Sequence, residues 1–442
     1  MYFLCRNCGK EIKDHGRSFT LKCPHCGELN FSRLYQYGEK NFYHFQDQRA
    51  SYPSGQYQEL EEVYYYPEFF QRKKLSPISV LVHTSLFLLL ILLILNLLSL
   101  FPAVVEVAKN AHKSDGIVWL FFVVPFPPYI ISFDRFLLQE FGVNIYLGSY
   151  FILFYFILIA LAILYSFYHV FKKEGEEALC GIYNGIVGKD VSSVGDIPLF
   201  GLLFKKLKRE SQSPQPPSTP AENKKFGSED NALILILKLF MVSLFVNVAY
   251  IILTYTILGE GVEEPVFLKK MSFWVRLFSL ARASVYEEFV SRILLIGLPL
   301  YFCHRYLKRK EPSSSPRIRN YLFGGRIEMD GFAIFFLLLS SILFGMAHLS
   351  GWNIYKVFPS AVAGILMGYL FLKKGVASSI LLHFLVNYMS IPSQLWDPFY
   401  IITVYTMLTF LISIFTGMVL TAYYLVRIKN WFLKRSAKGR EG

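Results

Sequence analysis

The chain has 442 residues, of which 54% are hydrophobic, and its formal net charge is +13. A mean hydropathy of +0.38 is too high for an ordinary soluble domain and favours a polytopic membrane protein. The excess of Lys and Arg falls in a few loops, as the positive-inside rule describes. No continuous basic face is evident, so we expect no nucleic-acid partner.

Four cysteines near the N-terminus form two pairs, Cys5 with Cys8 and Cys23 with Cys26. Each CxxC can present two thiolates to one metal, and four thiolates satisfy a tetrahedral Zn²⁺. A redox or disulfide pair is the alternative, which a reduced cytosolic compartment disfavours. Residues 1–30 are therefore predicted to be a structural zinc ribbon that can recruit a cytosolic protein partner. The four thiolates leave no open coordination position for catalysis.

Apolar segments follow a juxtamembrane connector at residues 31–76. A stretch at 117–133 contains three prolines, which remove helix donors, so we expect a re-entrant or interfacial segment there. The predicted fold class is an all-α polytopic membrane protein, a bundle of about eight transmembrane helices with the zinc ribbon as a small added module. The eight predicted spans are 77–103, 146–171, 232–258, 272–303, 331–349, 357–372, 375–392 and 400–426.

The distribution of charge predicts the topology. Loops 172–230 and 304–330, the turn at Lys373 and Lys374, and the tail at 428–442 are basic, whereas the opposite loops are acidic or neutral. Basic loops remain on the cytoplasmic side. Eight spans with both termini in the cytoplasm satisfy every loop, and the Ser- and Pro-rich middle of the 172–230 loop is predicted to be disordered.

Two adjacent carboxylates, Glu287 and Glu288, lie inside the fourth predicted span. Ionisable residues at such depth are costly and mark functional sites by default. Glu288 and Arg292 are four residues apart on a helix, so they share a face and can pair. Glu287 points about 100° away from that face and is left for chemistry. Arg276 and Arg282 precede the pair and are interpreted as an interfacial helix start without a chemical role.

Two later spans each contain a histidine, His348 and His383. Phe344 lies one turn before the first histidine, and Asn387 lies one turn after the second. Histidine and asparagine can donate to a developing oxyanion, and a Glu–His pair can deprotonate a water that attacks a peptide carbonyl. The alternatives are a structural ion-pair staple between helices and histidines that only hydrogen-bond neighbouring helices.

In this order and spacing, Glu287-Glu288-xxx-Arg292, Phe344-xxx-His348 and His383-xxx-Asn387 resemble the motifs of the CPBP (Abi) family. That family comprises type II CAAX prenyl endopeptidases and bacteriocin-processing or immunity proteins, and the resemblance covers residues 272–392. It implies that Glu287 and His348 activate water and that His383 and Asn387 stabilise the oxyanion. Glu288, Arg292 and Phe344 would support them.

The resemblance divides the remaining chain into an accessory transmembrane region at 77–230 and a protease-like domain at 231–427. The predicted function is an intramembrane endopeptidase that acts on a membrane-anchored or lipidated substrate. The family is often labelled a metalloprotease, although the mechanism it is thought to use needs no metal; two histidines and a glutamate could also ligate Zn²⁺. A membrane scaffold or immunity-type protein is the rival hypothesis, and the lack of an inverted repeat disfavours a transporter.

Overall fold

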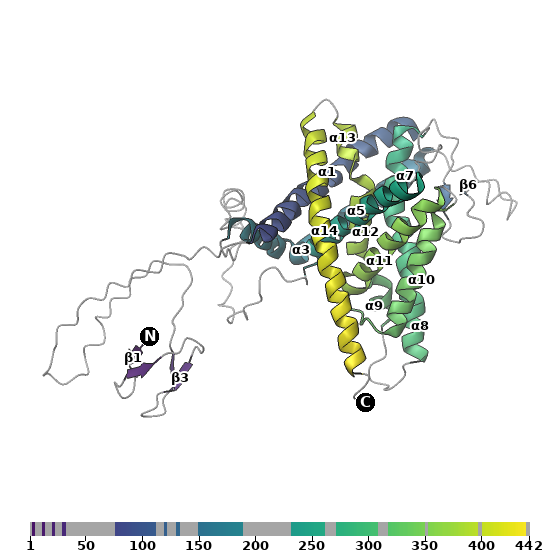
Figure 1. Cartoon of the computed structure of the whole chain (residues 1–442). Coiled ribbons are helices and arrows are strands. Elements are labelled where there is room, and N and C mark those ends of the chain that lie inside the picture. The colour runs from purple at the N-terminus through teal and green to yellow at the C-terminus, as the bar shows by residue number, and fades with distance from the viewer. Residues whose placement is uncertain are drawn as a thin grey trace, which may run out of the picture. The chain divides into compact units, whose positions relative to one another are not determined.

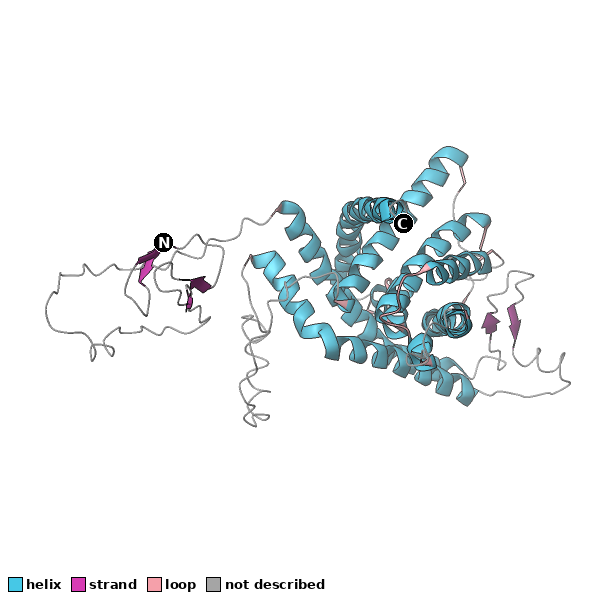
Figure 2. Cartoon of the chain, turned by 90° about the horizontal axis from the view of Figure 1, so that it is seen from below, coloured by secondary structure: helices cyan, strands magenta, loops and turns pink. Residues whose placement is uncertain are grey.

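The structure of the chain is a computed structural model that divides into two units, Met1–Phe70 and Gln71–Gly442. Figure 1 shows its helices and strands, and Figure 2 shows the same chain from below. The residues described are 2–4, 11–13, 20–22, 29–31, 76–111, 119–121, 130–132, 149–188, 231–260, 271–307, 317–349, 352–396 and 400–438.

The first unit contains two short antiparallel hairpins. Strand β1 (Tyr2–Leu4) pairs with β2 (Glu11–Lys13), and β3 (Thr20–Lys22) pairs with β4 (Leu29–Phe31). In the sequence, one predicted cysteine pair falls in the connection of each hairpin. The four cysteines themselves lie outside the described residues, so the zinc ribbon stays a prediction.

The second unit is helical, and a helix or a run of helices occurs at each of the eight predicted apolar segments. The agreement is closest for the third segment, which was predicted at 232–258 and has these bounds in the structure. The helices are α1 (Pro77–Asn110), α3 (Ser149–Val187), α5 (Ala232–Leu258), α7 (Phe273–Glu288), η4 (Phe289–Gly297), α8 (Leu298–Tyr306), α9 (Ile318–Phe323), α10 (Gly331–Ala347), η6 (Ile354–Lys356), α11 (Val357–Lys374), α12 (Val376–Tyr388), α13 (Ile391–Leu395) and α14 (Tyr400–Lys438).

Five helical segments in the described part of the chain are long and apolar enough to cross a membrane: α1, α3, α5, η6 with α11, and α14. The apolar helices α10 and α12 have 17 and 13 residues, shorter than the roughly 20 residues that a perpendicular span requires. The segment predicted at 272–303 is built from α7, η4 and α8. The chain is thus an integral, multi-pass membrane protein, and eight spans remain a prediction, as does the side on which the termini lie.

The proline-rich segment at 117–133 contains two strands where the structure describes it. Strand β5 (Trp119–Phe121) pairs antiparallel with β6 (Ile130–Ser132). These six residues are extended, as expected from three prolines that oppose a helix between them. The prediction that this segment is not a spanning helix therefore agrees with its described part.

Local side-chain chemistry sets several helix boundaries. The Ser76 hydroxyl accepts a hydrogen bond from the Ser79 amide (3.1 Å), and Asn231 caps α5 in the same way. Gly259 ends α5 with a φ of 69°, a left-handed conformation that glycine adopts without steric cost. Asp330 caps α10 by accepting from the Ala333 amide at 2.9 Å.

Close helix packing holds the site region together. Helix α11 packs against both α10 and α12, α12 packs against α7, and α14 packs against α5. A Cβ on Gly364 would lie 3.0 Å from Ser341, and one on Gly368 would lie 2.4 Å from Leu337. These two glycines, four residues apart, therefore let α10 approach α11, as small residues do between membrane helices.

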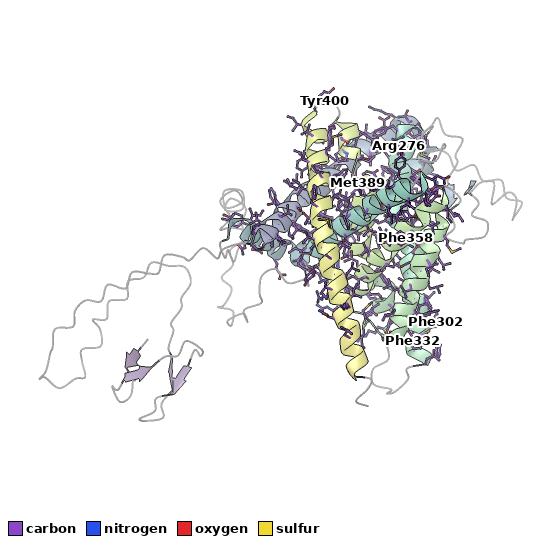
Figure 3. The ribbon with its side chains drawn as sticks, in the orientation of Figure 1. Arg276, Phe302, Phe332, Phe358, Met389 and Tyr400 are labelled. Atoms are coloured by element: carbon purple, nitrogen blue, oxygen red, sulfur yellow. The ribbon has the colours of Figure 1, made fainter. Side chains whose placement is uncertain are left out.

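The outer surface of the bundle is apolar. Large side chains are exposed along α14, among them Val404, Met407, Leu411 and Phe415. Figure 3 shows carbon-rich side chains over the length of the helices, with Phe302 and Phe332 near one end and Arg276 nearer the other. A surface of this kind suits contact with lipid and not with water.

Candidate active site

The centre of the site is a buried ion pair at the junction of α7 and η4. Glu288 and Arg292 are both fully buried, and Arg292 Nε lies 3.0 Å from Glu288 Oε2. The pairing predicted from their four-residue spacing is confirmed. Arg292 also reaches Ser340 on α10, whose hydroxyl donates to the Ser291 carbonyl at 2.6 Å.

A π-helix begins directly after Glu288 and continues to Gly297. Such wider turns are uncommon and are frequently found at functional sites. Here the π-helix carries Arg292 and joins α7 to α8, so the carboxylates and their cationic partner lie on either side of a change in helical geometry. Periodicity in the sequence predicts a continuous α-helix through this region and gives no signal for the π-helix.

His383 on α12 connects the two carboxylates. Its Nδ1 donates to Glu288 Oε1 at 2.9 Å, and its Nε2 lies 3.8 Å from Glu287 Oε2. The Ser379 hydroxyl, one turn earlier on α12, also donates to Glu288. Glu288 thus has three polar partners that fix it, and it orients the imidazole ring so that Nε2 faces Glu287.

Phe344 on α10 packs among the charged and polar groups. Its ring makes edge contacts with His348 (5.0 Å between centroids) and His383 (5.9 Å), and the Arg292 guanidinium lies 5.4 Å from its centre. The supporting role predicted for Phe344 stays a prediction. The ring holds two histidines from different helices at defined angles.

His348 lies at the C-terminal end of α10. Its Nδ1 donates to the Phe344 carbonyl at 2.8 Å, which makes Nε2 the acceptor in the neutral ring. Glu287 interacts electrostatically with His348 and with Lys356 at the end of η6. The structure therefore gathers Glu287, His348 and His383 at one place, although the direct contact it records for Glu287 is with His383.

Asn387 was predicted to be an oxyanion donor. In the structure its amide nitrogen donates to the Leu280 carbonyl at 3.3 Å and to the Ser284 hydroxyl at 3.2 Å, both on α7. Donation to an oxyanion would require one of these bonds to open. In the state described, Asn387 joins α12 to α7.

Two serines and one lysine of the site were missed by sequence reasoning. Ser340 and Ser379 each lie four residues before a motif residue, Phe344 and His383 respectively, so the same helical spacing could have found them. Lys356 stacks on Trp352, with its ammonium 4.6 Å from the ring centre. Its closeness to Glu287 depends on the fold, and the sequence carries no signal for it.

No group of three or more His, Cys, Asp or Glu side chains is arranged to hold a metal ion within the described ranges. The predicted zinc ligands of the ribbon are outside those ranges. A catalytic zinc held by Glu287 and the histidines, the alternative derived from the sequence, stays a hypothesis.

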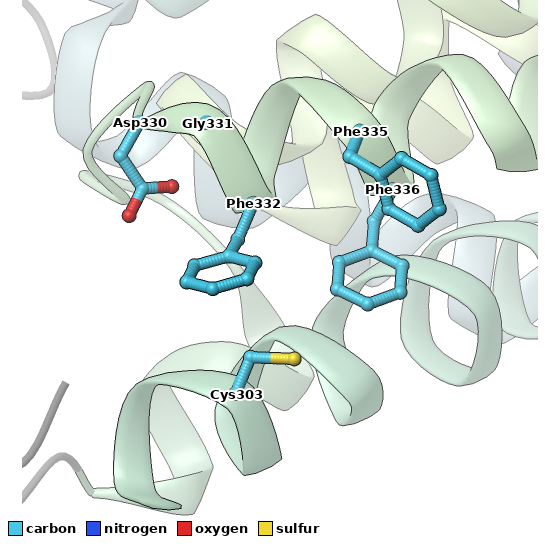
Figure 4. Close-up of a pocket in the computed structure, with 6 residues that line it drawn as sticks. All are labelled: Cys303, Asp330, Gly331, Phe332, Phe335 and Phe336. Atoms are coloured by element: carbon cyan, nitrogen blue, oxygen red, sulfur yellow. The ribbon is translucent and has the colours of Figure 1, made fainter. Parts of the chain in front are cut away.

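An open apolar groove of about 640 Å³ lies between α8 and the beginning of α10. Figure 4 shows Cys303 facing Phe332 and Phe336 across it. Phe336 and His348 are 12 residues apart on α10, about 18 Å along the helix axis. The groove is therefore separate from the cluster of carboxylates and histidines.

Residues 269–389 match the family model of the Rce1-like type II CAAX prenyl endopeptidases. This segment contains every residue of the cluster, from Glu287 on α7 to Asn387 on α12. The match supports the resemblance to the CPBP family and a CAAX-type intramembrane protease. Neither the curated proteins nor the solved structures contain a match to the chain.

Proposed function

We propose that the protein is an intramembrane endopeptidase that hydrolyses a peptide bond of a lipidated, membrane-anchored substrate. The observation that carries this proposal is the contact of His383 with two carboxylates, Glu287 and Glu288, inside a helical membrane bundle. The family match over the same residues supports it. Beyond the buried pair of Glu288 with Arg292, the cluster holds a second acid, Glu287, within 3.8 Å of His383.

The two carboxylates have different surroundings, which favours a division of roles. Glu288 is fully buried and bonded to Arg292, His383 and Ser379. The Glu287 side chain is 12% exposed, and its contact with His383 is long, at 3.8 Å. A general base must reach both water and its substrate. We therefore assign this role to Glu287 and a positioning role to Glu288.

In the proposed reaction, Glu287 with His348 removes a proton from a water molecule, whose oxygen attacks the scissile carbonyl carbon. Asn387, and His383 as an imidazolium whose Nε2 also carries a proton, would donate to the oxyanion that forms. The C–N bond then breaks, and the proton is passed to the leaving amine, which yields one new carboxylate and one new amine. No step needs a redox partner, and water is the only co-reactant.

Purified protein in lipid nanodiscs, incubated with a farnesylated CAAX peptide, tests the proposal by mass spectrometry of the products. Wild-type protein should release a C-terminal fragment. Loss of a general base typically slows such reactions by about 10²–10⁴-fold, so Glu287→Ala should abolish release while leaving the unfolding curve unchanged. Glu176→Ala, which removes an exposed carboxylate from α3, is the matched control and should keep full activity. Equal activity in Glu287→Ala would sink the mechanism.

We also propose that Cys5, Cys8, Cys23 and Cys26 hold one structural zinc. Two hairpins with a CxxC in each connection have the strand arrangement that such a ribbon needs. The metal would supply folding energy to a segment too short to build its own core. The ribbon is proposed to bind a cytosolic protein partner, and both termini are proposed to be cytoplasmic.

A further inference from the structure

Arg282 on α7 is a buried cation that the proposed reaction does not use. Its side chain is only 9% exposed, and its Nε has no hydrogen-bond partner among the described residues. Guanidinium groups are among the side chains that are almost never buried unless they are paired. A buried Nε–H without an acceptor leaves one donor of the guanidinium open to a ligand.

The surroundings of Arg282 place that open donor beside the proposed catalytic cluster. The groups that act on it electrostatically are the phenols of Tyr155 and Tyr286 and the carboxylate of Glu287. The Tyr155 ring packs edge-on against Phe278, one turn before Arg282, at 5.9 Å. Arg282 therefore lies on the side of α7 near α3, in aromatic surroundings, and Glu287 is the carboxylate that acts on it among the described residues.

We infer that Arg282 binds the free C-terminal carboxylate of the peptide that is cleaved, an inference that rests on the proposed function. Arginine presents paired donors that match a carboxylate in a bidentate arrangement. With that carboxylate held, the scissile carbonyl would be delivered to Glu287. Tyr155 belongs to α3, so the accessory helices would complete a substrate site whose catalytic groups lie on α7, α10 and α12.

The spacing along α7 gives a lower limit for the length of the fragment. Arg282 and Glu287 are five residues apart, which is about 7.5 Å along the helix axis. An extended peptide covers about 3.3 Å per residue. Five residues also turn the helix by about 140°, so the two side chains are farther apart than this rise, and the bond that Glu287 attacks should lie at least about two or three residues from the bound carboxylate.

Binding tests this assignment without depending on catalysis. The probe is a fluorescent farnesylated CAAX peptide, made either with a free C-terminal carboxylate or as the C-terminal amide. Binding to the full-length Glu287→Ala protein is measured in nanodiscs, and binding to empty nanodiscs is subtracted. The acid should bind at least about 10-fold more tightly than the amide, because the loss of one partner of a buried charge pair weakens binding by this much or more.

Substitutions at Arg282 then locate the preference. Adding Arg282→Gln should bring the two affinities to within about two-fold, and Arg282→Lys should keep part of the preference because the charge remains without the fork. Arg276→Gln is the matched control: it removes the same charge from the same helix at a half-buried position, where Arg276 donates to Gln394. It should leave the preference intact.

Three results would overturn the inference. They are equal binding of acid and amide, binding of neither peptide, and a preference that survives in the folded Arg282→Gln protein. If Arg282 binds a lipid phosphate instead, the acid peptide and the amide peptide should bind equally. Arg282 could instead act by positioning Glu287. In that case Arg282→Gln in the active protein should slow cleavage of the acid peptide and the amide peptide equally and shift the pH profile of cleavage. That result would also overturn the inference. Cleavage of neither peptide by the wild type would count against the proposed function, and the binding result still decides the role of Arg282.

Discussion

Replacement of Arg292 by leucine should destabilise the protein strongly. The change removes the one cation that lies within 4 Å of Glu288 among the described residues, in a place where both side chains have no exposed surface. Breaking a buried ion pair from one side typically costs about 3–5 kcal/mol, because an uncompensated charge stays buried. Ser379 and His383 remain as partners of Glu288 and offset part of this cost, so we expect about 3 kcal/mol.

Glu288→Gln should cost a similar amount, because it leaves Arg292 buried and unneutralised. The double variant removes both charges and should lose less than the sum of the two single changes. A coupling of at least about 2 kcal/mol is expected, within the range found for residues in one network. Unfolding by SDS in mixed micelles, followed by tryptophan fluorescence, gives the four free energies of the cycle.

The control pair is Lys374 with Glu174, which are 3.8 Å apart and partly exposed. Lys374→Gln should cost at most about 1 kcal/mol, as partly solvated pairs do. Additive effects of Arg292→Leu and Glu288→Gln to within about 0.5 kcal/mol would refute the reasoning, because they would mean that the buried pair contributes no mutual stabilisation.

Three further predictions use the same protein. Gly417→Ala should destabilise the bundle by about 1–3 kcal/mol in the SDS assay, because its Cβ would lie 2.1 Å from a backbone carbonyl of α5. Gly331→Ala is the control: a Cβ there would meet open space, so stability should change by less than about 0.5 kcal/mol. Equal effects of the two substitutions would contradict the close packing of α14 on α5. Asp330→Ala should cost about 1–2 kcal/mol through loss of the α10 cap and of the contact with His304 Nε2 at 3.0 Å, and an unchanged unfolding curve would contradict this. Metal analysis should find one zinc per chain that disappears in Cys5→Ser; a second zinc that persists there and disappears in His348→Ala would replace the metal-free mechanism.

Local contacts of the site could be predicted from the sequence, because helical spacing fixes them. Glu288 and Arg292 pair as their four-residue separation requires, and the same spacing brings Phe344 to His348. The eight apolar segments also coincide with helices, since hydrophobic run length is the dominant signal in a membrane chain. Their lengths were less predictable, as the 13 residues of α12 show.

Contacts between helices could not be predicted, because they depend on the rotation and depth of each helix in the bundle. Glu287 was paired with His348 from the sequence, whereas the structure records its direct contact with His383. Asn387 donates to α7, a partner more than 100 residues away in the chain. The open Arg282 Nε is of the same kind, since its lack of an acceptor among the described residues can be seen only when the neighbouring helices are in place.

The most direct test of the proteolytic function compares peptide termini in cells. Membrane proteomes from cells that express the wild type or Glu287→Ala at matched levels are analysed by mass spectrometry. We predict new C-termini on lipidated membrane proteins with the wild type only, which would also identify the substrates. Indistinguishable termini, with both proteins folded, abundant and expressed in their native host, would contradict the account and favour a membrane scaffold.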